Sequence, residues 1–260
     1  MVSVGAPTVE PFTRLSEDVW LSRVASEDTP LNIGLVIGPD RAVLVDPGPA
    51  GAEDEVYANL LARVRELTDA ELVVVSTHGH ADHIGANPYL RAHGASAVWA
   101  HRDAGVETAT DLVGEEPVTL ELGQGLSVVL EHLGRGHTEG DLVAGVRRED
   151  REGRGILFCG DLVREGTDPR FRDSYPKEWV RTLGRIWSMS GTYAKFVPGH
   201  GRPVDAEFVA SMRRRMEQGH HVSSQAIQDA ATDATKAIPI LPYGPDESRE
   251  LITRLRGDDA

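Results

Sequence analysis

The stretch LVVVSTHGHADH, residues 72–83, places several potential metal ligands directly after an apolar run. The β-branched run at 72–75 is typical of a buried strand. Four potential ligands follow it: His78, His80, Asp82 and His83. The small side chains of Gly79 and Ala81 let the backbone bend closely around an ion. Three imidazoles and a carboxylate crowded into one turn would be costly to bury without a cation. The stretch therefore predicts a metal site at the end of a strand.

Further potential ligands occur later in the chain, again just after strand-like runs. They are His137, Asp161 and His200, each preceded by a glycine. Taken singly, such a histidine is more often an ordinary loop residue, and an aspartate after glycine is more often a turn residue. Their shared placement after strands favours metal binding instead. Asp46 ends the apolar run 43–45 in the same way.

The motifs together resemble one known family. The segment from His78 to His83 resembles the His-x-His-x-Asp-His signature of the metallo-β-lactamase superfamily. Three later motifs resemble its remaining ligand motifs in the same order: Gly136-His137-Thr138, Phe158-Cys159-Gly160-Asp161 and Pro198-Gly199-His200-Gly201. Asp46 resembles the family's early aspartate. The resemblance covers roughly residues 30–204 and implies an α/β fold, a four-layer αββα sandwich with the site at one edge.

The same resemblance implies two metal ions that share the ligands. It assigns His78, His80 and His137 to one metal and Asp82, His83 and His200 to the other. Asp161 bridges the two. A mixed nitrogen and oxygen set without thiolate suits Zn²⁺ and also tolerates Fe or Mn. We therefore expect two divalent metal ions as cofactors, with Zn²⁺ ahead of Fe and Mn.

Two such ions imply hydrolysis without a serine or cysteine nucleophile. Metals about 3.5–4 Å apart share a hydroxide and polarise the carbonyl or phosphoryl oxygen that it attacks. We expect this hydroxide to attack an ester, thioester, lactone or β-lactam type bond. Two carboxylates are assigned catalytic roles. Asp82 ligates one metal and orients the hydroxide, while Asp46 accepts a hydrogen bond that fixes a ligand or its loop.

Two positions depart from well-known subfamilies. Glyoxalase II and many lactonase relatives have a second histidine in a Gly-His-Thr-x-Gly-His motif, where this chain has Asp141. Class B β-lactamases usually carry cysteine or serine at the position of Asp161. The pattern is more similar to a broad bacterial group of MBL-fold metallohydrolases. Two alternatives stay open: a mononuclear iron oxygenase similar to persulfide dioxygenases, and a metal-binding member of the fold without catalysis.

The hydrophobic pattern predicts strands and helices along the whole chain. Strands are expected at 33–37, 42–45, 72–75, 97–100, 126–130, 142–146, 156–159 and 194–197. A helix at 179–187 is expected to bury one face that includes Trp179 and Trp187. We assign residues 1–204 to the catalytic domain and 205–260 to a helical extension packed on it. For the extension, the open roles are covering the site, forming a homodimer contact, or capping the sandwich.

Composition narrows the partners. The chain of 260 residues carries 27 Lys and Arg against 41 Asp and Glu, a net charge of −14, which disfavours nucleic acid as a partner. No apolar run is long enough to span a membrane. Cys159 is the only cysteine, and residues 1–7 lack the pattern of a signal peptide. We therefore expect a cytoplasmic enzyme acting on a small-molecule substrate.

Overall fold

The computed structural model describes residues 8–24, 30–49, 51–149, 153–229 and 233–257. The N-terminal segment, on which the expectation about a signal peptide depends, lies outside the described residues. Within them, no helix is both long enough and apolar enough to cross a lipid bilayer.

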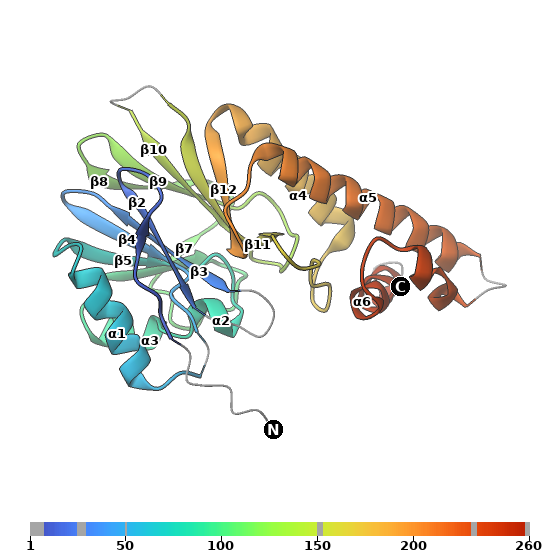
Figure 1. The fold of residues 1–260 in the computed structure, drawn as a ribbon, viewed down its shortest axis with the longest axis horizontal. Helices are drawn as coiled ribbons and strands as arrows, with labels where there is room; N and C mark the ends of the chain where they lie inside the picture. The colour runs from blue at the N-terminus through green and yellow to red at the C-terminus, as the bar shows by residue number, and fades with distance from the viewer. Residues whose placement is uncertain (1–7, 25–29, 50, 150–152, 230–232, 258–260) are drawn as a thin grey trace.

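The first half of the chain forms one wing of a β-sheet (Figure 1). Its strands lie in the order β7-β6-β5-β4-β3-β2, with β1 beside β2. The pairs from β4 to β7 are parallel, and those from β1 to β4 are antiparallel. The bounds are β1 (Thr13–Arg14), β2 (Val19–Val24), β3 (Leu31–Ile37), β4 (Arg41–Val45), β5 (Glu71–Val75), β6 (Ala97–His101) and β7 (Asp111–Val113).

The second half forms the other wing, in the order β12-β11-β10-β9-β8. Its strands are β8 (Val118–Gly123), β9 (Leu126–Glu131), β10 (Val143–Arg148), β11 (Gly155–Arg164) and β12 (Tyr193–His200). The wings meet where Leu31 of β3 pairs with His200 of β12. The buried amide of Asn32 donates hydrogen bonds to the carbonyls of Pro198 (2.9 Å) and Gly201 (2.8 Å) at this junction.

Helices cover the outer face of each wing. They are α1 (Asp54–Arg65), α2 (Ala81–Ile84) and α3 (Asn87–Ala92) in the first half, and α4 (Pro176–Ser188), α5 (Ala206–Gln228) and α6 (Pro245–Gly257) in the second, with short 3₁₀ turns η1 (Met189–Gly191) and η2 (Ala234–Ile240). Asp205 caps α5, because its carboxylate accepts a hydrogen bond from the Phe208 amide at 2.9 Å.

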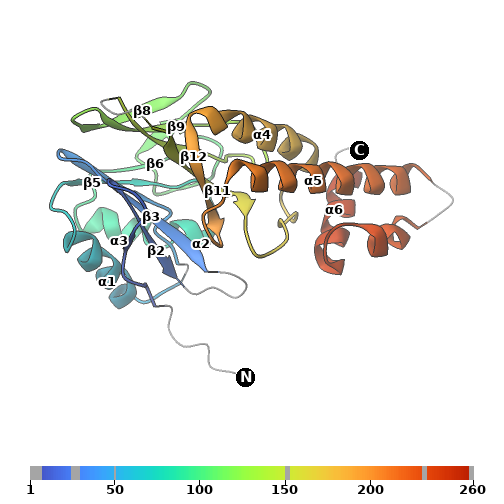
Figure 2. The same cartoon turned by 45° about the horizontal axis from the view of Figure 1, so that its top comes forward.

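Three apolar cores separate the layers. The core between the wings joins Val43 of β4 with Phe158 of β11. A second core packs α1 and α3 on the first wing, and a third packs α4, α5 and α6 on the second wing, with Trp179 fully buried in it. The order helix, sheet, sheet, helix confirms the predicted α/β class and its four layers. Figure 2 shows α6 lying against α5, beyond the edge of the sheets.

Most predicted elements are present. The eight strands and the helix expected at 179–187 are confirmed within a few residues, while β1, β2, β7 and β8 were not predicted. The prediction for Trp187 was wrong: its side chain lies on α4 with 45% exposure, whereas Trp179 is at 0%. Ile186, one residue earlier in the same turn, is fully buried in the third core, so Trp187 lies just outside the buried face of the helix.

This difference gives a test of the third core. Trp179→Ala removes a fully buried indole, so we expect the free energy of unfolding to fall by about 3–5 kcal/mol. Trp187→Ala, on the same helix, is the matched control and should change it by less than about 0.5 kcal/mol. Urea denaturation measures both. Equal effects of the two substitutions would contradict the assignment of α4 to this core.

Candidate metal centre

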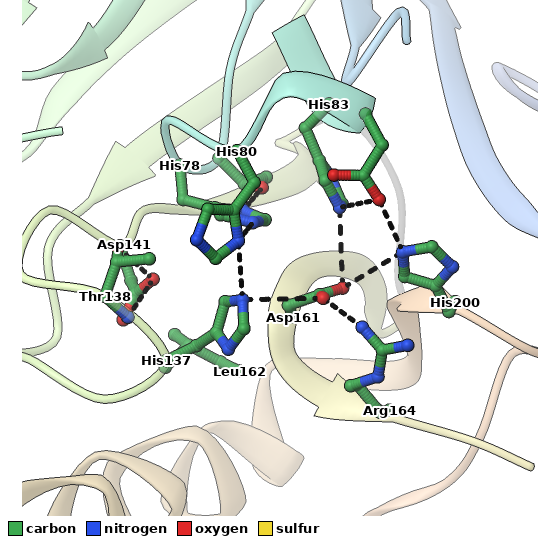
Figure 3. A network of polar contacts seen from close by, with 12 residues as sticks. His78, His80, His83, His137, Thr138, Asp141, Asp161, Leu162, Arg164 and His200 are labelled. Carbon is green, nitrogen blue, oxygen red and sulfur yellow. Dashed lines mark hydrogen bonds and ion pairs between the residues drawn. The ribbon is translucent and has the colours of Figure 1, made fainter. Parts of the chain in front are cut away.

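The potential ligands lie at the ends of strands from both wings. His78 and His80 follow β5, and Asp82 and His83 lie on the short helix α2. From the second wing come His137 after β9, Asp161 within β11 and His200 at the end of β12. The carboxyl ends of parallel strands commonly form ligand sites in α/β sheets. The structure brings all seven sequence-predicted ligands together here (Figure 3).

Three imidazoles converge in a first ligand set. Nδ1 of His80 lies 3.1 Å from Nε2 of His78 and 3.0 Å from Nε2 of His137. In a tetrahedral Zn²⁺ site, nitrogens at about 2.0–2.1 Å from the metal lie roughly 3.3 Å apart. Hydrogen bonds among three imidazole edges cannot all be satisfied, whereas one cation satisfies all three. The first ligand set (His78, His80, His137) therefore fits one metal ion.

Asp82, His83 and His200 form a second ligand set. Oδ2 of Asp82 lies 3.2 Å from Nε2 of His200 and 3.8 Å from Nε2 of His83. Asp161 lies between the sets. Its Oδ1 is 3.6 Å from Nε2 of His83, and its Oδ2 is 3.5 Å from Nε2 of His137. One carboxylate thus presents an oxygen to each set.

The polar atoms of this centre fit metal ions better than they fit one another. Nε2 of His83 and Oδ1 of Asp161 are buried, and neither has a hydrogen-bond partner among the described residues. Burying such atoms without a partner is costly. Both point into the space between the two ligand sets, where a cation would satisfy them. The nitrogen and oxygen donors present are those that Zn²⁺ and similar divalent ions accept.

Hydrogen bonds on the far side of the rings hold the ligands. Nδ1 of His83 contacts Oδ2 of Asp46 at 2.9 Å, and Nδ1 of His78 contacts Oγ1 of Thr77 at 3.1 Å. Thr77 in turn donates from its amide and its hydroxyl to Asp46, both at 2.7 Å. Such contacts fix which ring nitrogen faces the metal. Asp46 itself is buried and is not among the residues whose potential ligand atoms lie grouped in the centre.

Two further contacts involve residues that the sequence did not indicate. Oδ2 of Asp173, in the segment between β11 and α4, lies 2.8 Å from Nε2 of His80. The buried guanidinium of Arg164 donates to Oδ2 of Asp161. Thr77 was also missed, although it directly precedes the histidine motif. For Asp173 no local pattern exists, because only the fold places it beside His80.

Glycine is required at two points around Asp161. Gly199 passes so close that a β-carbon there would lie 2.1 Å from Oδ1 of Asp161. Gly160 has a φ of +51°, and a β-carbon there would lie 2.3 Å from Oγ1 of Thr77. Both positions precede a ligand. The glycines therefore let two strands approach the centre more closely than any other residue would allow.

Comparison with known proteins identifies the family. The sequence profile described as the metallo-beta-lactamase superfamily matches residues 27–200. The chain belongs to this superfamily. A metallo-beta-lactamase type 2 of Bacillus cereus is 29% identical over 211 residues, covering 75% of this chain and 77% of that protein. A hydroxyacylglutathione hydrolase of Methylococcus capsulatus is 28% identical, covering 84% of this chain and 83% of that one.

Other matches are shorter or structural. The hydroxyacylglutathione hydrolase of Gloeothece citriformis is 29% identical over 159 residues, which is 58% of its length. The crystal structure of the DIM-1 metallo-beta-lactamase superposes with a TM-score of 0.67 and 22% identity, covering 82% of this chain and 97% of that chain. That likeness shows a shared fold. As a member of the metallo-beta-lactamase superfamily, the chain is a metal-dependent hydrolase.

The histidines of this superfamily member's two ligand sets differ in pKa, and within the first set the hydrogen bond with Asp173 raises the pKa of His80. Burial lowers the pKa of His137 to about 4, and burial together with His83 lowers the pKa of His78. Burial also opposes a charge on His83, but the carboxylates of Asp46 and Asp161 outweigh it and raise the pKa to about 9. His83 must therefore lose a proton when its Nε2 binds a metal.

Residues outside the ligand sets have structural roles. Asp141, where glyoxalase II relatives carry histidine, accepts hydrogen bonds from the amide and hydroxyl of Thr138. Burial raises its pKa to about 7. His101 is buried at the end of β6 and stacks on His132, with their ring centroids 4.1 Å apart. Cys159 is buried, and burial raises the pKa of its thiol.

Asp46→Asn tests the electrostatic coupling to His83. Removing this carboxylate should lower the pKa of the His83 ring in metal-free protein from about 9, because its main source of positive-charge stabilisation is lost. The folded pKa of His83 lies above the ordinary value of 6.5. The charged ring therefore contributes to the free energy of unfolding below pH 6.5, and this contribution is lost as the pH rises through 9. Nitrogen NMR titration of the imidazoles measures the shift. Asp246→Asn, at an exposed carboxylate on α6, is the control and should leave that pKa unchanged.

Asp141→Asn tests the buried carboxyl in the same protein. The folded pKa of about 7 exceeds the ordinary 3.8, so the native state favours protonated Asp141. The contribution of Asp141 to the free energy of unfolding is complete below pH 3.8 and is lost as the pH rises through 7. Relative to the Asn variant, wild-type metal-free protein should therefore lose unfolding free energy across this window. Urea denaturation at several pH values measures it, and a constant difference would count against a raised pKa.

Proposed function

We propose that the protein is a dinuclear metal-dependent hydrolase that cleaves an ester, thioester, lactone or β-lactam type bond. One observation carries this proposal: Asp161 turns one carboxylate oxygen toward each of two complete ligand sets. A single-metal site would need only one set. Two-metal sites of this kind commonly serve hydrolysis.

Zn²⁺ is the ion we propose for both positions. The first ligand set would hold one ion and the second ligand set the other, with Asp161 shared between them. Divalent ions bound there would supply a water molecule with a pKa of about 7 and would polarise the carbonyl oxygen of the substrate. Five imidazoles and two carboxylates, with no thiolate among them, support zinc but also fit iron or manganese.

The exposed side of the centre indicates how substrate approaches. The side chains of His80, Asp82 and Asp173 are 35%, 44% and 54% exposed, whereas those of His83, His137, Asp161 and His200 are at most 4% exposed. A small molecule can therefore reach the ligand sets only from the side of His80 and Asp82. Residues of the segment between β11 and α4 border this side.

Asp82 is the residue best placed to act on the nucleophile. Burial opposes its charge, but the hydrogen bond from His200 and the nearby His83 lower its pKa to about 2. Its carboxylate is thus ionised at neutral pH and lies on the open side of the centre. We assign it the role of accepting a hydrogen bond from the attacking water and so orienting it toward the carbonyl carbon.

The relatives support a carbonyl substrate without selecting one. Their names include a metallo-beta-lactamase and hydroxyacylglutathione hydrolases. Asp161 stands where class B β-lactamases usually have cysteine or serine, and Asp141 stands where glyoxalase II has histidine. These departures support a third branch of the superfamily. The net charge of −14 supports a small molecule rather than nucleic acid as substrate.

The test combines metal analysis with a substrate screen. Protein purified without added metal should contain two divalent ions per chain and should hydrolyse at least one thioester, lactone, ester or β-lactam probe. Removal of metal by a chelator should abolish turnover, and Zn²⁺ should restore it. Water labelled with ¹⁸O should place the label in the carboxylate product.

Asp82→Asn probes the assigned residue. We expect turnover of the same probe to fall by about 10²–10⁴-fold, because a positioned proton acceptor contributes on this scale. Asp246→Asn, at an exposed carboxylate far from the ligands in sequence, should retain wild-type turnover. One iron per chain with oxygen consumption, or full metal content with no turnover on any probe, would refute the proposed reaction.

A further inference from the structure

The segment between β11 and α4, residues 165–175, contacts both the metal ligands and the C-terminal helices. Asp173 in this segment lies 2.8 Å from Nε2 of His80, as described above. In Figure 1 the segment projects from the end of β11 toward α6. The helices α5 and α6 follow residue 200, where the match to the superfamily profile ends. These contacts therefore involve residues beyond the part of the chain that the profile matches.

Helix α6 holds the segment on both sides of Asp173. The amide of Phe171 donates to Oε2 of Glu247 at 3.1 Å. Nε of Arg254 donates to the carbonyl of Ser174 at 2.7 Å. These bonds fix the backbone two residues before Asp173 and one residue after it. Phe171 and Ser174 are themselves fully buried.

Other contacts hold the ends of the segment. Asp168 accepts from Arg215 of α5 at 2.7 Å and from the amide of Gly244 at 2.8 Å. At the other end, the guanidinium of Arg254 lies over the ring of Tyr175 at 5.4 Å, and that of Arg135 lies over the same ring at 4.1 Å. Cation–π contacts of this kind add to the hydrogen bonds. The segment is therefore anchored along its length by the extension.

Asp173 has little packing of its own. Its side chain is 54% exposed, and among the described residues the side chain to which it is hydrogen-bonded is that of His80. An exposed aspartate held only by its own backbone is placed by whatever fixes that backbone. The backbone around Asp173 is fixed within the segment by Ser174, whose amide and hydroxyl donate to the carbonyl of Phe171, and from α6 by Glu247 and Arg254. The position of the carboxylate beside His80 thus depends in part on α6.

We propose that Glu247 and Arg254 are positioning residues for the metal ligand His80, acting through the 165–175 segment and Asp173. Their hydrogen bonds hold Asp173 where it accepts from Nε2–H of His80. In the neutral ring that bond places the proton on Nε2, so the lone pair of Nδ1 is directed at the first ligand set. The extension at 205–260 therefore has a defined role: it sets the affinity of the first ligand set for its ion. The inference requires metal binding but not the proposed hydrolysis.

The experiment measures Zn²⁺ binding by competition with a chromophoric chelator. Asp173→Ala should weaken binding of one of the two ions about 10–100-fold, the usual effect of losing a partner of a ligating histidine. Glu247→Ala and Arg254→Ala should each weaken binding of that same ion by a smaller factor. Glu247→Gln, which keeps an oxygen that accepts from Phe171, should restore wild-type affinity. Arg249→Ala is the matched control, since Arg249 lies on α6 and pairs only with exposed Asp246 in the described contacts of its guanidinium.

A double-variant cycle separates positioning from general destabilisation. If Arg254 acts through Asp173, then Asp173→Ala combined with Arg254→Ala should bind no more weakly than Asp173→Ala alone. The absorption spectrum of the Co²⁺-loaded protein should change in the same variants. Wild-type affinity in both Glu247→Ala and Arg254→Ala, or fully additive losses in the double variant, would overturn the proposal. Should Arg254→Ala not fold, the Glu247→Ala and Glu247→Gln pair decides the question.

Discussion

The arrangement of the metal centre depends on the contacts that the buried carboxylate of Asp46 makes. Asp46 directly follows β4, accepts two hydrogen bonds from Thr77, two residues beyond β5, and contacts the ring of His83 on α2. Through Thr77 it also reaches His78. One side chain therefore sets the relative position of a ligand from each set. The backbone φ of Asp46 is 52°, a left-handed conformation that aspartate tolerates better than most residues.

The protein environment shifts the pKa values of the ligands in different directions. In the first ligand set, burial lowers the pKa of His78 and His137, so these two rings are neutral, whereas the hydrogen bond with Asp173 raises the pKa of His80. The second is surrounded by carboxylates that keep His83 protonated until a cation replaces the proton. The shared Asp161 is held ionised, since Arg164 and His83 outweigh the effect of its burial on its pKa. The guanidinium of Arg164 thus places a positive charge beside the centre, which partly offsets the negative charge of the carboxylates there.

The set of potential ligands and the fold class could be predicted from the sequence, for physical reasons. The ligands at 78–83 are contiguous, and His137, Asp161 and His200 each follow a strand, so local pattern and chain order were sufficient. The α/β class followed from strand and helix periodicity. Asp173 and Arg164 could not be predicted, because their contacts depend on how distant segments pack rather than on any nearby motif. Trp187 was misplaced for a related reason: helical spacing gives a face but not how far the neighbouring layer extends over it.

The junction of β3 with β12 divides the centre as well as the sheet. His78, His80, Asp82 and His83 belong to one wing, and His137, Asp161 and His200 belong to the other. Each ligand set draws from both. An ion in either set would therefore add a direct link between the two halves, beside the β3–β12 strand pair, the hydrogen bonds of Asn32, the ion pair of Arg148 with Asp18 and the apolar core between the wings. Because such an ion binds the native state alone, the cohesion of the wings becomes a function of metal supply.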